Sequence, residues 1–318
     1  MSDAHQTSQI SRNAKFIVTS VPGNRVRKTA VSGQYNQKIQ RQQMVYKEIS
    51  KNLDIRQFIP RYLGENRDTD GRQYFQVEAF PPGSTDLFEV LEKEKKILAS
   101  CTAQINQIYH TFSRHIECLR SIGNQILGIV KSLHDHHIAH GDLKPENLMI
   151  VQDGAGHVSV RLIDFEFTLL PGQTNLSFRG TPGYIPPQLL QKKIKDSPLS
   201  LQQRIPYTVE DIKHYDLWAC GVILVTLLSH MLYYELVLSK LRMEKTRHDV
   251  VERNARQIKA ILSIMMDAGN DERVKGIPAE ELSMVNQIMQ DNFRDYQFDL
   301  FSPFGKNVND KMLKDSNI

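Results

Sequence analysis

The stretch HGDLKPENL, residues 140–148, places an acid, an amine and an amide at fixed offsets within one short segment. A carboxylate at Asp142 can accept a proton from a hydroxyl group, and an amine at Lys144 can neutralise charge on a moving phosphoryl group. An amide at Asn147, five residues beyond the acid, can bind Mg²⁺. Together the three side chains predict a site for phosphoryl transfer.

This stretch resembles the catalytic loop of serine/threonine protein kinases, which reads His-Arg-Asp-Leu-Lys-Pro-x-Asn. Further motifs follow in the order that the family uses. The strand-like run VSVRLIDF delivers Asp164 twenty-two residues after Asp142, where kinases place the metal-binding aspartate of Asp-Phe-Gly. GTPGYIPPQ (180–188) resembles the end of an activation segment, and DLWACGV (216–222) resembles the start of the long buried helix of the large lobe.

The resemblance implies an α+β, bilobal protein-kinase-like fold. Residues 1–82 are expected to form a small β-rich N-lobe, in which residues 1–14 are flexible. Residues 83–318 are expected to form a larger, mostly α-helical C-lobe.

The same resemblance implies an ATP site that uses Mg²⁺ or Mn²⁺. Asp142 is expected to be the base, Lys144 the phosphate clamp, and Asn147 and Asp164 the metal ligands. The expected nucleotide contacts are Lys28 for the phosphates, the backbone of Glu78 and Phe80 for adenine, and Asp86 for the ribose.

The expected small lobe departs from the family pattern. No Gly-x-Gly-x-x-Gly loop precedes Lys28, and its neighbours Arg25 and Arg27 leave open that Lys28 is only a surface charge. The helix position that should supply a glutamate partner for Lys28 falls on Gln42, and Glu48 would require a different helical register. A pseudokinase scaffold is therefore one alternative.

Two departures lie inside the matching motifs. Gly141 replaces the arginine that lets many kinases sense a phosphorylated activation loop, which disfavours that mode of activation. Glu166 replaces the glycine of Asp-Phe-Gly, and two interpretations stay open: a bystander, or an extra contact to metal or water.

Motifs in and after the catalytic loop bear on the class of substrate. His-Gly-Asp also occurs in small-molecule kinases, so phosphorylation of a small molecule, or transfer of AMP, is a second alternative. Lys144-Pro145-Glu146 and Gly180-Thr181-Pro182 favour a protein substrate, because serine/threonine protein kinases share these features. In that family the threonine hydroxyl braces the acid and the lysine.

Alternation and turn residues predict the secondary structure. We expect strands at 15–20, 25–31, 58–63 and 73–80, a helix at 36–52, a hinge at 81–83 and a hairpin from 147–151 to 158–165. The apolar run 217–228 is too short to span a bilayer, which takes ~20 residues, so a core helix and no transmembrane segment are predicted.

Positive charge is concentrated in two regions. From residue 25 to residue 61 there are nine Lys or Arg against two acids, giving 9 − 2 = +7, although the whole chain carries only +4. The candidates within it are Lys38, Arg41 and Lys47. A second basic stripe, predicted as one helical face, contains Arg242, Lys245, Arg253 and Arg256. We expect a polyanion activator, such as an inositol polyphosphate or phosphoinositide, at one of the regions. Nucleic acid is not expected, because no aromatic residues are interleaved with these charges.

The overall expectation is an enzyme that transfers the γ-phosphoryl group of ATP to serine or threonine of a protein substrate. Three cysteines are too few for a disulfide framework, which favours a reducing compartment such as the cytoplasm. A well-matched catalytic loop on a divergent small lobe also resembles bacterial effector kinases, which are secreted into a host cell.

Overall fold

The computed structural model describes residues 8–12, 15–100, 105–177, 180–196 and 198–268. The N-terminal part forms an antiparallel sheet of five strands in the order β1-β2-β3-β5-β4. The strands are β1 (Ser8–Arg12), β2 (Phe16–Val21), β3 (Arg25–Ala30), β4 (Tyr62–Arg67) and β5 (Gln73–Glu78). Lys28 lies in the middle of β3, opposite Phe75 of β5.

One helix, α1 (Asn36–Ile49), packs on this sheet after the short helix η1 (Gly33–Tyr35). Its apolar face buries Ile39, Val45, Tyr46 and Ile49. Tyr46 also packs edge-on against Phe165, with a distance of 4.8 Å between ring centroids. The helix therefore contacts both the sheet and the segment that carries Asp164.

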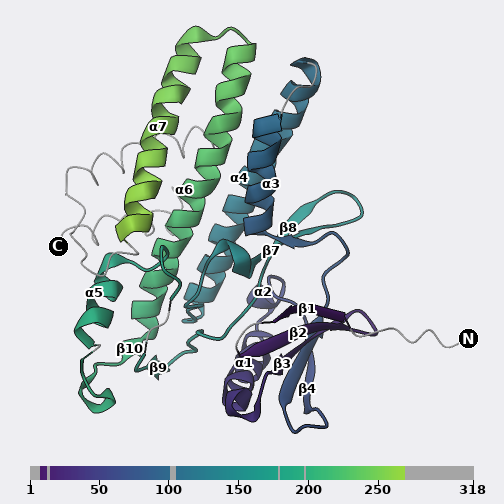
Figure 1. The fold of residues 1–318 in the computed structure, drawn as a ribbon, viewed down its shortest axis with the longest axis vertical. Coiled ribbons are helices and arrows are strands. Elements are labelled where there is room, and N and C mark those ends of the chain that lie inside the picture. The colour runs from purple at the N-terminus through teal and green to yellow at the C-terminus, as the bar shows by residue number, and fades with distance from the viewer. Residues whose placement is uncertain (1–7, 13–14, 101–104, 178–179, 197, 269–318) are drawn as a thin grey trace, which may run out of the picture.

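The C-terminal part is mostly helical. Its helices are α3 (Leu87–Ser100), α4 (Ile105–Asp135), η2 (Pro145–Asn147), α5 (Pro187–Asp196), η3 (Leu201–Gln203), α6 (Val209–Leu241) and α7 (Lys245–Ala268), and α2 (Leu53–Arg56) precedes them in the N-terminal part. Its strands are β6 (Thr85–Asp86), β7 (Leu148–Gln152), β8 (Val158–Leu162), β9 (Thr174–Asn175) and β10 (Tyr207–Thr208). Figure 1 shows the five-stranded sheet and α1 grouped together, with the long helices α3, α4, α6 and α7 extending away from them. These two groups confirm the predicted bilobal α+β fold.

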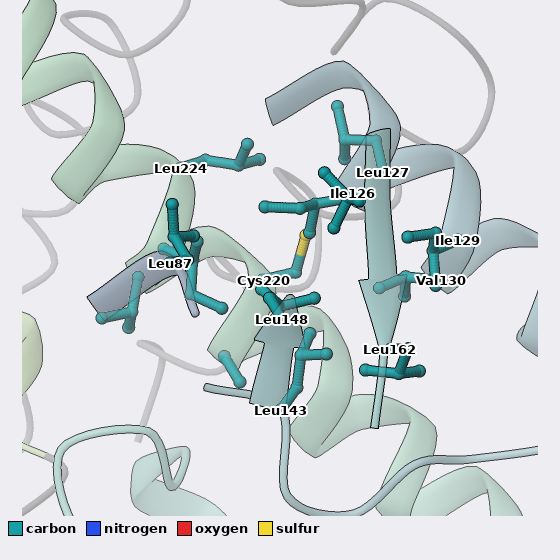
Figure 2. Packing of buried hydrophobic residues seen from close by; sticks show 14 of the residues in the cluster. Leu87, Ile126, Leu127, Ile129, Val130, Leu143, Leu148, Leu162, Cys220 and Leu224 are labelled. Carbon is teal, nitrogen blue, oxygen red and sulfur yellow. The ribbon is translucent and has the colours of Figure 1, made fainter. Parts of the chain in front are cut away.

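The core of the large lobe supports the 140–148 loop directly. Leu143 and Leu148, each next to a predicted site residue, are fully buried. Figure 2 shows both side chains in one cluster with Leu162 of β8 and Cys220 of α6. Apolar packing on both sides of the loop fixes the backbone from which Asp142 and Asn147 project.

The small lobe differs from expectation in two places. Within the stretch 1–14 that was expected to be flexible, Ser8–Arg12 pairs with β2 as an edge strand, and the rest of that stretch lies outside the described residues. The strand expected at 58–63 was wrong, because β4 begins only at Tyr62. Pro60 lacks a backbone N–H for a ladder, so residues 57–61 form a loop after α2. The carbonyl of Phe58 accepts the N–H of Leu162 at 2.7 Å, which joins this loop to the large lobe.

The prediction that residues 240–259 form one face of a single helix was also wrong. α6 ends at Leu241 and α7 begins at Lys245, with Met243 between them in the left-handed region (φ 57°) and 91% exposed. The two helices then pack against each other. No Gly or Pro marks this turn, so the periodicity of the sequence concealed it.

α6 is long and apolar enough to meet the length and hydropathy test for a membrane span, and it does so alone among the described residues. In this structure 72% of its most apolar window is buried inside the protein. That burial is what the predicted core helix requires.

Candidate active site

Lys144 and Asn147, two of the predicted site residues in the 140–148 loop, both contact the carboxylate of the third, Asp142. Thr181 donates its hydroxyl to Asp142 Oδ1 at 2.6 Å, and Asn147 Nδ2 lies 3.2 Å from Asp142 Oδ2. Lys144 Nζ lies 3.3 Å from Asp142 Oδ2 and 3.2 Å from Thr181 Oγ1. The predicted brace from Thr181 to the acid and the lysine is confirmed.

Asp216 of α6 holds the backbone of this loop. Its carboxylate accepts the N–H of His140 at 2.7 Å and the N–H of Gly141 at 2.9 Å. His134 Nε2 lies 3.2 Å from the same carboxylate, whose side chain is only 1% exposed. Sequence reasoning named Asp216 only as the start of a helix. The available signal was a lone acid beside the apolar run.

Gly141 explains why the family's arginine is absent. Its φ of +80° lies in the left-handed region, and a Cβ there would lie 2.7 Å from the carbonyl oxygen of Phe167. A side chain at this position would need the 165–168 segment to move. The local backbone therefore differs from one that could carry an arginine before the acid.

Asp164 is expected to bind the metal ion, and that role requires an ionised carboxylate. Burial alone would raise its pKa, but Lys28, His140 and the N–H of Glu166 together hold the pKa below its usual value. Its backbone is left-handed (φ 62°), a strained conformation of the kind found at functional sites. Ile163 donates its N–H to the carbonyl of Asn147 at 3.0 Å, which links the segments of the two expected metal ligands.

Lys28 reaches this carboxylate from the small lobe. Its Nζ lies 2.9 Å from Asp164 Oδ1 and 3.0 Å from Gln42 Oε1 of α1. Gln42 is fully buried. The structure thus places Lys28 inside the site, and Gln42 occupies the partner position that the helical register indicated, with an amide in place of a carboxylate.

Glu166 is bound by two lysines that sequence reasoning did not connect with it. Its Oε1 accepts from Lys38 Nζ of α1 at 3.1 Å and from Lys15 Nζ at 3.0 Å. Lys15 immediately precedes β2, at the end of the β1–β2 connection. In the sequence both pairs are separated by more than a hundred residues, so no local pattern could have revealed them.

The predicted adenine and ribose residues lie along the connection between the lobes. Glu78 donates its backbone N–H to the carbonyl of Arg61 at 2.9 Å, so its carbonyl is the group that it could offer to adenine. Phe80 follows two residues later, before the Pro81–Gly83 connection. Asp86 Oδ1 accepts the N–H of Glu89 at 2.9 Å at the start of α3, so a ribose contact would use its other oxygen.

These residues fit a metal–nucleotide site. The structure brings an ionised carboxylate, an amide and a half-buried lysine together between a β-rich lobe and a helical lobe. That is the donor set that holds Mg²⁺ and phosphates in kinases. The fold and the site together define a protein of the kinase class.

Comparison with known proteins supports the assignment to the kinase class. The family model "Protein kinase domain" matches residues 25–295, and the chain belongs to this family. A phosphorylase b kinase gamma catalytic chain of Bos taurus is 39% identical over 112 residues, which is 35% of this chain and 24% of that protein. The alpha chain of calcium/calmodulin-dependent protein kinase type II of Drosophila melanogaster is 39% identical over 107 residues, 33% of this chain and 17% of that protein. The chain therefore matches a quarter or less of the length of these relatives.

Proposed function

We propose that this protein transfers the γ-phosphoryl group of ATP to a serine or threonine hydroxyl of a protein substrate. One observation carries the proposal: Lys144, Asn147 and Thr181 all lie within hydrogen-bonding distance of the carboxylate of Asp142. A carboxylate so placed can accept the proton of an attacking hydroxyl, with an amine beside it to meet the developing charge.

The remaining side chains have separate tasks. Asp164 and the Oδ1 of Asn147 would hold Mg²⁺ or Mn²⁺, which supplies charge neutralisation on the phosphates when it is bound. Lys28, already at the carboxylate of Asp164, would pair with the nucleotide phosphates. The carbonyl of Glu78, the backbone of Phe80 and the second oxygen of Asp86 would orient adenine and ribose.

A protein substrate is favoured by the activation segment. Thr181 belongs to that segment and contacts both Asp142 and Lys144. The geometry of the transfer site therefore depends on the loop that meets a polypeptide in protein kinases. The relatives above are by name kinases of this kind. We also propose that the enzyme works in the cytoplasm. Cys118 and Cys220, which are free thiols in the described part of the chain, are compatible with a reducing compartment.

The test uses ATP labelled at either the γ or the α phosphate, with wild type and Asp164→Ala. We expect the γ label on protein, and none with Asp164→Ala. An α label on protein would show AMP transfer instead. Nucleotide binding without either label, in the presence and absence of a polyanion, would show a pseudokinase scaffold.

We also propose that a multiply charged anion activates the enzyme at a basic cleft on the connection between the lobes. The cleft has a volume of about 1100 Å³ and reaches from the end of α1 to β7 and β8. The lining has five basic residues against one acid, Glu78; the basic residues are Lys47, Lys51, Arg56, Arg61 and Arg161. Burial lowers the pKa of Arg161, so an anion beside it would offset a cost that the folded protein already bears.

The other predicted candidates are less suitable. Lys38 and Arg41 already contact Glu166 and the carbonyl of Thr168 beside the metal-binding segment. Lys47, Lys51 and Arg61 in the cleft are paired as well, but with exposed acids, in pairs that exchange readily with water and other anions. Arg253 and Arg256 line a smaller hollow, about 460 Å³, together with two carboxylates that would repel an anion. An anion in the basic cleft would touch both lobes and so favour one relative arrangement of them.

Thermal shift and activity with inositol hexakisphosphate test this second proposal. The cleft variant Lys51→Glu/Arg56→Glu should lose the response, whereas the control Arg253→Glu/Arg256→Glu on α7 should keep it. Vesicles containing a phosphoinositide distinguish a lipid headgroup from a free polyphosphate. Full activity in polyanion-free buffer, with no thermal shift from either source, would contradict the proposal.

A further inference from the structure

One face of α1 contacts the metal-binding segment along most of the helix. Lys38 binds Glu166, Arg41 donates to the carbonyl of Thr168 at 3.2 Å, and Gln42 accepts from Lys28. Tyr46 packs on Phe165. These four residues follow the spacing i, i+3, i+4 and i+8, which places them on one side of a helix. α1 therefore contacts Phe165, Glu166 and Thr168 directly, and Gln42 reaches Asp164 through Lys28.

The contact between Lys38 and Glu166 joins opposite full charges across this face of α1. The side chain of Glu166 is 12% exposed, whereas those of Lys38 and Lys15 are 34% and 31% exposed. A carboxylate so little exposed needs cationic or hydrogen-bonding partners to offset its burial. Two ammonium groups on one oxygen meet that need, and they come from different parts of the small lobe.

The arrangement has the reverse polarity of the usual link between a kinase small-lobe helix and its nucleotide site. The usual link is a helix glutamate that binds the nucleotide lysine. Here the helix offers a neutral amide to Lys28 at Gln42. The helix supplies the cation, Lys38, and the metal-binding segment supplies the anion, Glu166. The usual link joins the helix to the strand that carries the nucleotide lysine, β3 in this protein, whereas this link joins α1 to the metal-binding segment. Both fix the helix relative to the nucleotide site.

We propose that Glu166 is a positioning residue, which holds α1 and the start of β2 against the Asp164 segment through Lys38 and Lys15. In doing so it replaces the missing helix glutamate. The inference rests on the proposed phosphoryl transfer for its kinetic consequences. Glu166 acts on the reaction through the placement of Asp164 and Lys28, not by contact with the reacting atoms.

A direct metal contact by Glu166 is the rival explanation. Glu166 is two residues from Asp164, and a third carboxylate could approach the metal. The geometry favours positioning, because the contacts that the structure shows for the Glu166 carboxylate are two ammonium groups on Oε1, both from the small lobe. The two explanations differ in what the removal of Lys38 should do, since Lys38 matters only if Glu166 acts as a link.

Kinetics of three variants test the link. Glu166→Gln and Lys38→Met should each lower kcat/KM for ATP by about 10-fold, a typical size for coupling between sites. Lys38→Arg, which keeps the charge, should retain most of the activity. The control is Glu48→Gln near the C-terminal end of α1, where the exposed side chain of Glu48 pairs with exposed Lys51. Its kinetics should equal those of wild type.

The double variant Glu166→Gln/Lys38→Met separates coupled from independent effects. If the two residues act as one link, the second change should add little to the first. Full additivity would overturn the proposal. A rise in the Mg²⁺ requirement with Glu166→Gln alone, but not with Lys38→Met, would overturn it in favour of a metal ligand.

Hydrogen exchange gives a readout that needs no enzymatic activity. Amides of α1 should lose protection in Glu166→Gln and Lys38→Met, and keep it in Glu48→Gln. Unchanged protection of α1 in both link variants would overturn the proposal, even in a protein that transfers phosphate normally. Reduced protection in a protein without any transfer activity would leave the link standing and reject only the proposed function.

Discussion

The catalytic loop of the large lobe is held by buried hydrogen bonds, whereas the nucleotide side of the small lobe is held by partly exposed ion pairs. Asp216, which binds the loop backbone, has a side chain 1% exposed, and its neighbour His134 is 8% exposed. Lys15 and Lys38, which bind Glu166, are 31% and 34% exposed. Polar groups in a dry core are costly to leave unpaired, while exposed pairs exchange with water and salt. The half that matches the family motif is thus held by buried polar contacts, and the half that departs from it is held by partly exposed ones.

Removal of the two acids should have the largest effect. Asp164→Ala should abolish transfer, because a charged metal ligand is lost while the apolar core stays intact. Asp142→Ala should lower kcat by about 10²- to 10⁴-fold with a nearly unchanged nucleotide Kd, since it acts on the acceptor hydroxyl. Steady-state kinetics and nucleotide titration measure both quantities. The control Asp135→Asn, in an exposed pair with Lys131, should match wild type. Near-full activity of Asp164→Ala would reject the assignment of that motif.

Loss of the buried anchor should come next, as an effect on stability. Asp216→Ala leaves the N–H groups of His140 and Gly141 without their acceptor, which should cost about 3 kcal/mol or more of the free energy of unfolding. Urea unfolding measures this cost. Glu210→Ala, on an exposed side of the same helix, is the comparison. A cost equal to that of Glu210→Ala would mean that the buried network does not hold the loop.

Gly141→Ala should give a smaller loss of stability, about 1–3 kcal/mol, because the new Cβ meets the Phe167 carbonyl in a left-handed backbone. Gly154→Ala is the matched control, since a Cβ there meets nothing within 4 Å. Equal unfolding midpoints for the two variants would show that the 140–148 loop adapts freely.

The smallest expected effect concerns pH. The pKa of Asp164 is lower in the folded protein than its usual value of about 3.9, so the unfolded chain binds more protons as the pH falls below about 4. The stabilising contribution of this carboxylate is fully present above that pH and is lost as the pH falls through the folded pKa. Asp164→Asn should therefore lose stability less steeply on acidification. Identical slopes for wild type and variant would contradict the ion pair with Lys28.

The sequence was sufficient to predict the site wherever the residues concerned are close together in the chain. The offsets of Asp142, Lys144 and Asn147 predicted a site that the structure assembles, and helical periodicity placed Gln42 opposite Lys28. The contacts of Glu166 could not be predicted, because Lys15 and Lys38 approach it only through the packing of the lobes. The edge strand β1 was missed because its polar residues are held by backbone hydrogen bonds, which leave no apolar pattern.

The most direct test of the account is autophosphorylation by the wild type and Asp142→Ala with Mg²⁺ and then Mn²⁺, each with and without inositol hexakisphosphate. We predict transfer of the γ-phosphoryl group to serine or threonine by the wild type in at least one of these conditions, and its loss in Asp142→Ala at equal nucleotide occupancy. Nucleotide bound at saturation with no transfer under any condition, or equal transfer by both proteins, would contradict the account.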